Sequence, residues 1–336
     1  MKFSPVIISV AMLAFLSTVA HGGTWAGGAV KTSSGSREYK LWVASLYSKE
    51  KPVALILMLH GCMQKAEELA AFSGMNDLAD KNGFLVAYPE QTVTANPLRC
   101  WNWFDSKHQT RDAGEPSLVA AVIQDVRSSY NIDARRVYAI GISAGGAMAV
   151  VMGVTYPEMF AGLGVIAGVE FKAATTVQAG LAAMKSGGPD PNDQGLLAFQ
   201  TIQKSLAGAK TRIPVIAFQG MKDPYVSPLN ADQLIAQWAQ TNDYLDDGKD
   251  NDSVSIQTAK ETKGAVPNGY SFTKYSYYDS AKRLLMEKWL VDGLGHAWSG
   301  SPIANQFADP KGPNASAEMW RFFEASWDSK TKGGNQ

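Results

Sequence analysis

Residues 139–146, which read Ala-Ile-Gly-Ile-Ser-Ala-Gly-Gly, limit the fold of this 336-residue chain more than any other segment. An apolar run that begins at Val137 ends in this segment, and a second run of small, apolar residues follows at once. A Gly-x-Ser-x-Gly pattern between two such runs predicts a buried strand, a sharp turn and a helix, with Ser143 at the turn. Gly141 and Gly145 lack the side-chain bulk that a turn with strained backbone angles would exclude.

The rest of the chain alternates apolar, β-branched runs with helical patterns. This alternation predicts an α/β fold with a mostly parallel central sheet and helices on both faces. Several strand candidates are nearly continuous apolar runs, as expected for strands that are buried on both sides. The expected strands are 39–46, 53–59, 84–88, 137–142, 163–167, 213–218, 270–278 and 284–291. The expected helices are 66–80, one that starts at Pro116, 145–156, 230–241 and 316–327.

Three segments interrupt this alternation. Residues 21–36 are rich in Gly and Ser and are expected to be a flexible lead-in. Residues 171–211 are expected to form a helical excursion over the sheet. Residues 242–268 are polar and acidic, which is typical of a solvated surface insertion.

The N-terminus has the pattern of a secretory signal peptide. A short basic start is followed by an apolar run from Val6 to Ala20 and then by small residues. We therefore expect residues 1–22 to be removed and residues 23–336 to form a single domain that is secreted, either extracellular or periplasmic. A retained membrane anchor is the alternative, but the run is shorter than the roughly 20 residues that a span needs, so we expect no stable membrane insertion. Lys and Arg together number 31, as do Asp and Glu, so no excess charge favours nucleic acid as a partner.

The two cysteines of the chain are Cys62 and Cys100. An even pair in an exported chain favours a disulfide, because the compartment is oxidising. A free, buried pair is the alternative. A bridge that closes a loop of this length contributes about 3–4 kcal/mol to stability in the chain-entropy description.

Ser143 could act as a nucleophile only with a base that accepts its proton. His296 is the favoured base, because it follows the expected strand 284–291 in a glycine-containing loop, where open α/β sheets place functional groups. Asp223, just after the expected strand 213–218, is the favoured acid for orienting that ring. The order Ser, Asp, His along the chain is that of α/β-hydrolases. A packing role for His296 and a simple turn role for Asp223 are the alternatives, and Asp292 is the second candidate for the acid.

A negatively charged tetrahedral intermediate would need hydrogen-bond donors beside Ser143. The backbone N–H of Ala144 is one expected donor, and the N–H of Cys62, in the loop after the expected strand 53–59, is the other. The Cys62–Cys100 bridge would then hold this loop in place. The chain has too few His and Cys residues in ligand spacing to predict a metal site, and we expect no cofactor.

Four segments together resemble a known family. The segments are Leu59-His-Gly-Cys-Met-Gln64, Arg99-Cys-Trp-Asn-Trp-Phe104, Gly141-Ile-Ser-Ala-Gly-Gly146 and Gly293-Leu-Gly-His-Ala-Trp-Ser-Gly300. With these segments the chain resembles the catalytic domain of poly(3-hydroxybutyrate) depolymerases over roughly residues 37–325. These proteins are esterases of the α/β-hydrolase fold and are close to feruloyl and acetylxylan esterases.

The resemblance implies a secreted serine esterase for 3-hydroxyalkanoate esters, namely poly(3-hydroxybutyrate) or its oligomers. It assigns Ser143, Asp223 and His296 to catalysis and Cys62 to the oxyanion loop. Three tryptophans would line the substrate cleft, although core positions are an equal alternative: Trp101, Trp103 and Trp298. Family members commonly add a polymer-binding domain, which we do not expect here, so soluble oligomers or amorphous polymer are favoured over crystalline polymer. A feruloyl or acetylxylan esterase and a non-catalytic exported binding protein are the alternative functions.

Overall fold

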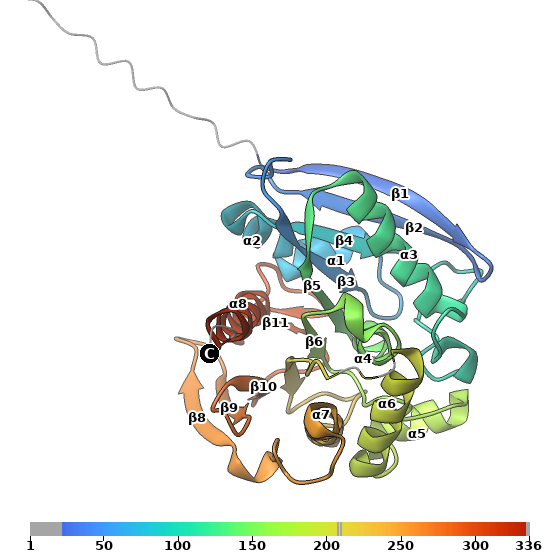
Figure 1. Cartoon of the computed structure of the whole chain (residues 1–336). Helices are drawn as coiled ribbons and strands as arrows, with labels where there is room; N and C mark the ends of the chain where they lie inside the picture. The colour runs from blue at the N-terminus through green and yellow to red at the C-terminus, as the bar shows by residue number, and fades with distance from the viewer. Residues whose placement is uncertain (1–21, 207, 209, 334–336) are drawn as a thin grey trace, which may run out of the picture.

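The structure of the chain is a computed structural model that describes residues 22–206, 208 and 210–333 (Figure 1). Ten strands form one continuous sheet in the order β1-β2-β4-β3-β5-β6-β7-β10-β9-β8. The predicted signal peptide falls almost entirely on residues 1–21, which lie outside the described residues.

The sheet has a parallel centre and antiparallel edges. Strands β4, β3, β5, β6, β7 and β10 pair in parallel, whereas β2 and β1 on one side and β9 and β8 on the other pair antiparallel. The strands of the sheet are β1 (Thr24–Thr32), β2 (Gly35–Val43), β3 (Val53–Leu59), β4 (Leu85–Pro89), β5 (Ile132–Ile142), β6 (Gly162–Ile166), β7 (Val215–Gly220), β8 (Lys260–Ala265), β9 (Ser271–Tyr278) and β10 (Leu284–Val291). A separate short parallel pair consists of β11 (Trp298–Ser299) and β12 (Ala308–Asp309).

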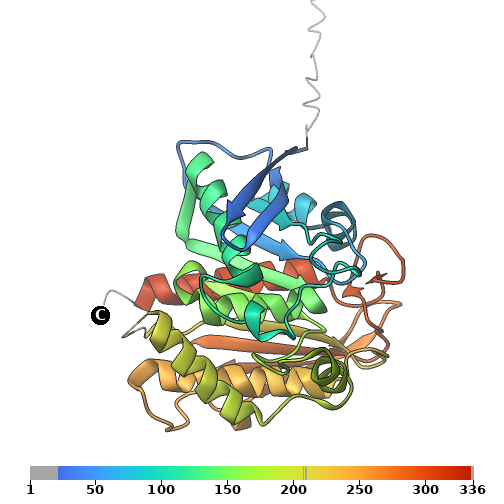
Figure 2. The same cartoon turned by 90° about the vertical axis from the view of Figure 1, so that its right-hand side faces the viewer.

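Helices cover both faces of the sheet. Helices α3, α4, α6 and α7 lie on one face and α1, α2 and α8 on the other (Figure 2). The helices are α1 (Ala66–Ser73), α2 (Met75–Asn82), α3 (Gly114–Ser129), α4 (Ala144–Thr155), α5 (Val177–Ser186), α6 (Pro191–Ser205), α7 (Leu229–Asp247) and α8 (Ala315–Gly333). None of these described helices combines the length and the hydropathy that crossing a bilayer requires.

Strand β3 shows why the central strands are continuous apolar runs. Leu55 and Leu57 pack into the hydrophobic core on the α3 and α4 face, and Ile56 and Met58 pack into the core on the α1 and α8 face. A strand between two helical layers has no face in contact with water, so no alternation of polar residues is needed. The predicted bounds of this strand and of β10 match the structure.

The predicted helix over 66–80 is two helices. Gly74 adopts φ 62°, which ends α1 in the left-handed conformation and begins α2. This backbone angle is accessible to glycine at little cost, and the apolar spacing continues across the break. Periodicity alone therefore could not separate the two helices.

Two edge strands were not predicted. The expected lead-in over 21–36 contains β1, which pairs with β2 over its whole length from Thr24 to Thr32. The expected insertion over 242–268 contains the end of α7 and the whole of β8, which pairs with β9. Both strands lie at sheet edges and are largely exposed, so their residues lack the apolar run that marks a central strand.

Candidate active site

Ser143 occupies the sharp turn between β5 and α4. Its backbone angles are φ 58° and ψ −123°, a strained conformation for a residue with a side chain. A Cβ atom at Gly141 would lie 2.1 Å from the carbonyl oxygen of Gly145, and one at Gly145 would lie 2.0 Å from that of Leu59. The two glycines are thus required by close backbone contacts, as the Gly-x-Ser-x-Gly pattern predicted.

His296 and Asp223 meet at the edge of the sheet where β7 and β10 end. The distance between His296 Nδ1 and Asp223 Oδ2 is 2.7 Å. Because β7 and β10 are parallel neighbours, the loops that follow them leave the sheet side by side. Gly220 allows this close approach, since a Cβ atom there would lie 2.3 Å from the carbonyl oxygen of Gly295.

The carboxylate of Asp223 is fully buried and held in one orientation. Its Oδ1 atom accepts hydrogen bonds of 2.9 Å from the backbone N–H groups of Tyr225 and Val226. Its Oδ2 atom accepts from the amide of Gln219 at 3.3 Å and faces the imidazole of His296. An ionised carboxylate can only accept, so His296 Nδ1 carries the proton and Nε2 is left as the basic nitrogen.

Ser143 and His296 line one cleft of about 220 Å³. No hydrogen bond between the described residues joins the Ser143 hydroxyl to the imidazole. Catalytic hydrogen bonds are often long in a free enzyme and shorten when substrate binds. The structure therefore brings the three predicted residues to one place, with Asp223 behind the ring of His296. The carboxylate of Asp292, the alternative acid, instead accepts a hydrogen bond from the hydroxyl of Ser271 on the neighbouring strand β9.

Two backbone N–H groups beside the cleft have no partner among the residues that the structure describes. Cys62 lines the cleft, and its N–H donates to no described group. Ala144 is the first residue of α4, and its N–H is likewise free within the described chain. Free N–H groups at a helix start form a favourable environment for negative charge. Both predicted oxyanion donors are thus available.

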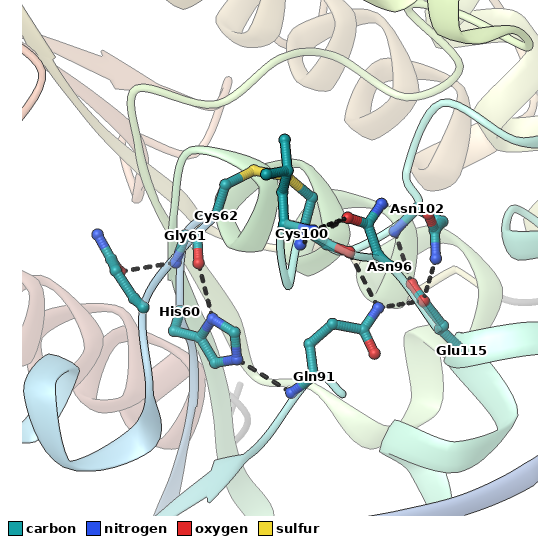
Figure 3. Close-up of a disulfide and its surroundings, with 10 residues drawn as sticks. His60, Gly61, Cys62, Gln91, Asn96, Cys100, Asn102 and Glu115 are labelled. Atoms are coloured by element: carbon teal, nitrogen blue, oxygen red, sulfur yellow. Dashed lines mark hydrogen bonds between the residues drawn. A yellow bond between two sulfur atoms is a disulfide. The ribbon is translucent and has the colours of Figure 1, made fainter. Parts of the chain in front are cut away.

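The disulfide between Cys62 and Cys100 is present, as predicted (Figure 3). It connects the loop after β3 to the loop after β4. Next to the bridge, the N–H of Met63 donates to the carbonyl of Leu98 at 2.7 Å, which joins the same two loops a second time.

A buried polar network lies behind the bridge (Figure 3). The carboxylate of Glu115 accepts from the backbone N–H of Asn102 at 2.7 Å, from the side chain of Asn102 at 2.6 Å and from the side chain of Gln91. The amide of Gln91 also donates to the carbonyl of Cys100 at 3.0 Å. This network was not predicted, because Gln91, Asn102 and Glu115 share no sequence motif.

His60 belongs to the same buried polar network and does not line the cleft. Its Nδ1 atom lies 2.7 Å from the carbonyl oxygen of Gly61, and its Nε2 atom accepts from the N–H of Gln91 at 3.0 Å. Burial lowers the pKa of His60 to about 4. The ring is therefore neutral over the range in which most enzymes work, and both nitrogens are occupied.

The three tryptophans that the sequence left equally open between cleft and core lie in the core. Trp101 and Trp298 are fully buried, and Trp103 is 6% exposed. The indole of Trp298 donates to Ser316 at 3.1 Å, on the α8 side of the sheet. Other side chains, none of which was predicted to line the cleft, form its walls: Met63, Gln64, Met184, Tyr225, Gln306 and Phe307.

Glu170, in the loop after β6, is a buried acid that was not predicted either. It is 3% exposed, and neither carboxyl oxygen has a hydrogen-bond partner among the described residues. Burial, and to a smaller degree the charge of Asp190, raises the pKa of Glu170 to about 8. The carboxyl packs against the backbone of Gly188, which follows α5. No group of three or more His, Cys, Asp or Glu side chains within the described residues is arranged to hold a metal ion.

Comparisons with known proteins point in one direction. A sequence model for the family described as "Esterase PHB depolymerase" matches residues 38–264. Poly(3-hydroxyalkanoate) depolymerase C of Paucimonas lemoignei is 32% identical over 251 residues, which are 74% of this chain and 55% of that protein. Feruloyl esterase B of Neurospora crassa is 28% identical over 255 residues, which are 72% of this chain and 78% of that protein. The match thus spans only about half of the depolymerase.

One solved structure supports the fold. The acetyl xylan esterase from Aspergillus awamori matches with a TM-score of 0.68 at 17% identity and covers 90% of this chain and 100% of that one. At this identity the likeness is one of fold alone, and it agrees with the α/β-hydrolase fold expected from the sequence.

Proposed function

The chain belongs to the PHB depolymerase family of carboxylic ester hydrolases, and from that membership we propose that it is a serine esterase for short-chain 3-hydroxyalkanoate esters. Ser143 is the proposed nucleophile, His296 the base and Asp223 the acid that orients the base. The observation that supports this proposal best is the 2.7 Å contact of His296 with a fully buried Asp223, in a cleft that Ser143 also lines.

The proposed reaction has two acyl-transfer steps. In the first, Ser143 Oγ attacks the ester carbonyl while His296 Nε2 accepts its proton. The charge that develops on the carbonyl oxygen faces the free N–H groups of Cys62 and Ala144. The alcohol leaves with a proton from His296, and an acyl-enzyme forms. Water then attacks the acyl group by the same route and releases the acid.

The size of the cleft favours a small acyl group. Its volume of about 220 Å³ is below the roughly 300–1,000 Å³ that is typical of sites for drug-sized ligands. Met63, Met184 and Phe307 give it apolar walls, which suit an aliphatic acyl chain. A 3-hydroxybutyryl group fits these conditions better than a feruloyl group, which carries a substituted aromatic ring.

A carbohydrate-directed esterase is the second candidate. The match to feruloyl esterase B extends over 78% of that protein, against 55% of depolymerase C. An acetyl group would fit the cleft as well as a hydroxybutyryl group. In this case the cleft would remove acetyl groups from a polysaccharide by the same chemistry.

Hydrolysis rates on three substrates distinguish these functions. Purified protein is compared on 3-hydroxybutyrate oligomers, acetylated xylan and methyl ferulate. We expect kcat/KM for the oligomers to exceed that for methyl ferulate by about 10–200-fold, the range that pocket size alone can provide. A preference for acetylated xylan would support the second candidate instead. Absence of turnover on all three would favour a binding protein that retains the fold.

A variant of the cleft wall tests the size argument directly. Met184→Ala enlarges the cleft. We expect it to lower the ratio of kcat/KM for hydroxybutyrate oligomers to kcat/KM for methyl ferulate. Leu181→Ala is the matched control, because Leu181 lies on the same helix, is 60% exposed and does not line the cleft. If this ratio of kcat/KM values is the same in the two variants, the assignment of Met184 to the acyl pocket is contradicted.

Export from the cytoplasm is part of the proposal. The Cys62–Cys100 disulfide is consistent with an oxidising compartment. Detection of the protein in the periplasm or medium, with a new N-terminus near residue 23, is the expected result. A cytoplasmic protein with an intact N-terminus would contradict it.

A further inference from the structure

We propose that the edge hairpin β1–β2 carries a second binding site, which takes a neutral, hydroxyl-rich saccharide chain. A cavity of about 540 Å³ lies over this hairpin and shares no lining residue with the catalytic cleft. We call it the hairpin groove and define it by Trp25, Gly27, Ala29, Glu38, Lys40 and Glu90. The proposal concerns binding, so it does not depend on which ester the cleft hydrolyses.

The floor of the hairpin groove is a strip of backbone. Alternate residues of a strand point to the same face, so Trp25, Gly27 and Ala29 share one face of β1. Across the pair, Gly27 lies opposite Lys40, and Ala29 lies opposite Glu38. Gly27 has no side chain and Ala29 only a methyl group, which leaves an open path of about 14 Å from Trp25 to Ala29. A short oligosaccharide has this length.

Trp25 provides a fixed aromatic surface at one end of the path. Its ring contacts Trp42 at 5.2 Å and Tyr88 at 5.7 Å between centroids, and these contacts hold it in place. The side chain is nevertheless 44% exposed. An amphipathic, rigid ring of this kind presents apolar area at low entropic cost, and the C–H face of a sugar ring can stack on it.

The polar groups of the hairpin groove call for a ligand that donates hydrogen bonds. Lys40 is paired with Glu67, and Glu90 is paired with Arg99 at 3.2 Å. Glu38 is exposed, and its carboxylate has no hydrogen bond or ion pair among the described residues. A carboxylate accepts only, so the free groups here select donors such as hydroxyls.

This requirement excludes the polyester chain as the favoured occupant. A poly(3-hydroxybutyrate) chain offers ester oxygens, which also only accept, and would face the Glu38 carboxylate unfavourably. A cationic ligand could also donate to Glu38, so binding of a polyamine is the competing outcome that the titration below distinguishes from saccharide binding. A neutral saccharide can stack a sugar ring on Trp25 and donate hydroxyl hydrogen bonds to the carboxylate acceptors.

The hairpin groove and the catalytic cleft lie on either side of the start of α1. Glu67, in the first turn of α1, borders the groove, whereas Met63 and Gln64, just before this helix, border the cleft. A saccharide held in the groove would keep the cleft close to a polysaccharide surface. If the second candidate function holds, this surface carries the ester, and the site places the esterase near its substrate without taking part in the chemistry.

Calorimetric titration with xylohexaose and with cellohexaose tests the proposal. Two variants alter the groove in different ways. Trp25→Ala removes the aromatic surface, and Ala29→Trp fills the path while every native polar group stays. Tyr278→Ala, at an exposed aromatic residue on β9, is the matched control. Hydrolysis of a small soluble ester is measured in each protein to show that the fold and the cleft are intact.

We expect the wild type and Tyr278→Ala to bind at least one of the two oligosaccharides. Both groove variants should bind at least tenfold more weakly, with unchanged hydrolysis of the soluble ester. Absence of oligosaccharide binding in the wild type would overturn the proposal. It would also be overturned if Ala29→Trp bound the oligosaccharide with the same affinity as the wild type. Groove-dependent binding of poly(3-hydroxybutyrate) granules or of spermidine, without oligosaccharide binding, would overturn it as well.

Discussion

Replacement of Glu170 by glutamine tests whether a buried, unpartnered carboxyl makes the stability of this protein depend on pH. In the folded protein the pKa of Glu170 is raised from 4.5 to about 8 by burial. In the unfolded chain the carboxyl is in water and ionises near its ordinary value. Between these two values the folded state therefore holds one proton more than the unfolded state.

The sign and size of the effect follow from this difference. The contribution of Glu170 to the free energy of unfolding is fully present below about pH 4.5 and is lost as the pH rises through about 8. Each unit of difference between the two pKa values corresponds to about 1.4 kcal/mol. Wild-type protein should therefore lose on the order of 4 kcal/mol relative to Glu170→Gln between pH 4.5 and pH 9.

The assay is urea unfolding of both proteins at each unit of pH from 5 to 9. At each pH the free energy of unfolding of the variant is subtracted from that of the wild type. The amide of glutamine does not ionise, so any cost of burying it is the same at every pH and cancels from the slope. Titration of His60 is common to both proteins and also cancels. Glu261→Gln, at an exposed position on β8, is the control and should run parallel to the wild type. If the free energies of unfolding of Glu170→Gln and the wild type differ by the same amount at every pH, the reasoning is refuted.

Three further variants test other parts of the account. Asp223→Asn should lower kcat by about 10⁴-fold through the wrong imidazole tautomer while the circular dichroism spectrum is retained; near-normal turnover would contradict the role of Asp223. Gly145→Ala places a Cβ atom 2.0 Å from a backbone oxygen, so the free energy of unfolding should fall by about 1–3 kcal/mol or more, and an unchanged urea midpoint would argue against the tight turn. The double variant Cys62→Ser, Cys100→Ser should lose about 3–4 kcal/mol of stability together with part of kcat. If only stability falls, the bridge does not position the oxyanion loop.

The features that the sequence predicted best are those that a short segment determines. The turn at Ser143 could be recognised because the glycines on either side of it are required by local backbone contacts. Strand β3 could be placed because burial on both faces produces an unbroken apolar run. The disulfide followed from the count of cysteines and the expected compartment.

The features that were missed depend on what packs against what. A tryptophan near a catalytic motif is compatible with either the core or the cleft, and only the packing of Trp101 and Trp298 places them in the core. The edge strand β1 is held by pairing with β2 and by the contacts of Trp25, not by its own composition. The network around Glu115 joins the first turn of α3 to Gln91 and Asn102 in the segment between β4 and α3, and no pattern in the sequence connects these residues.

Labelling with a fluorophosphonate probe tests the central claim most directly, because the probe reacts only with a serine that a neighbouring base has activated. Peptide mapping by mass spectrometry should find one adduct, on Ser143, with none in Ser143→Ala and a much slower reaction in His296→Asn. Equal labelling of wild type and Ser143→Ala, or an adduct on a different residue, would contradict the account.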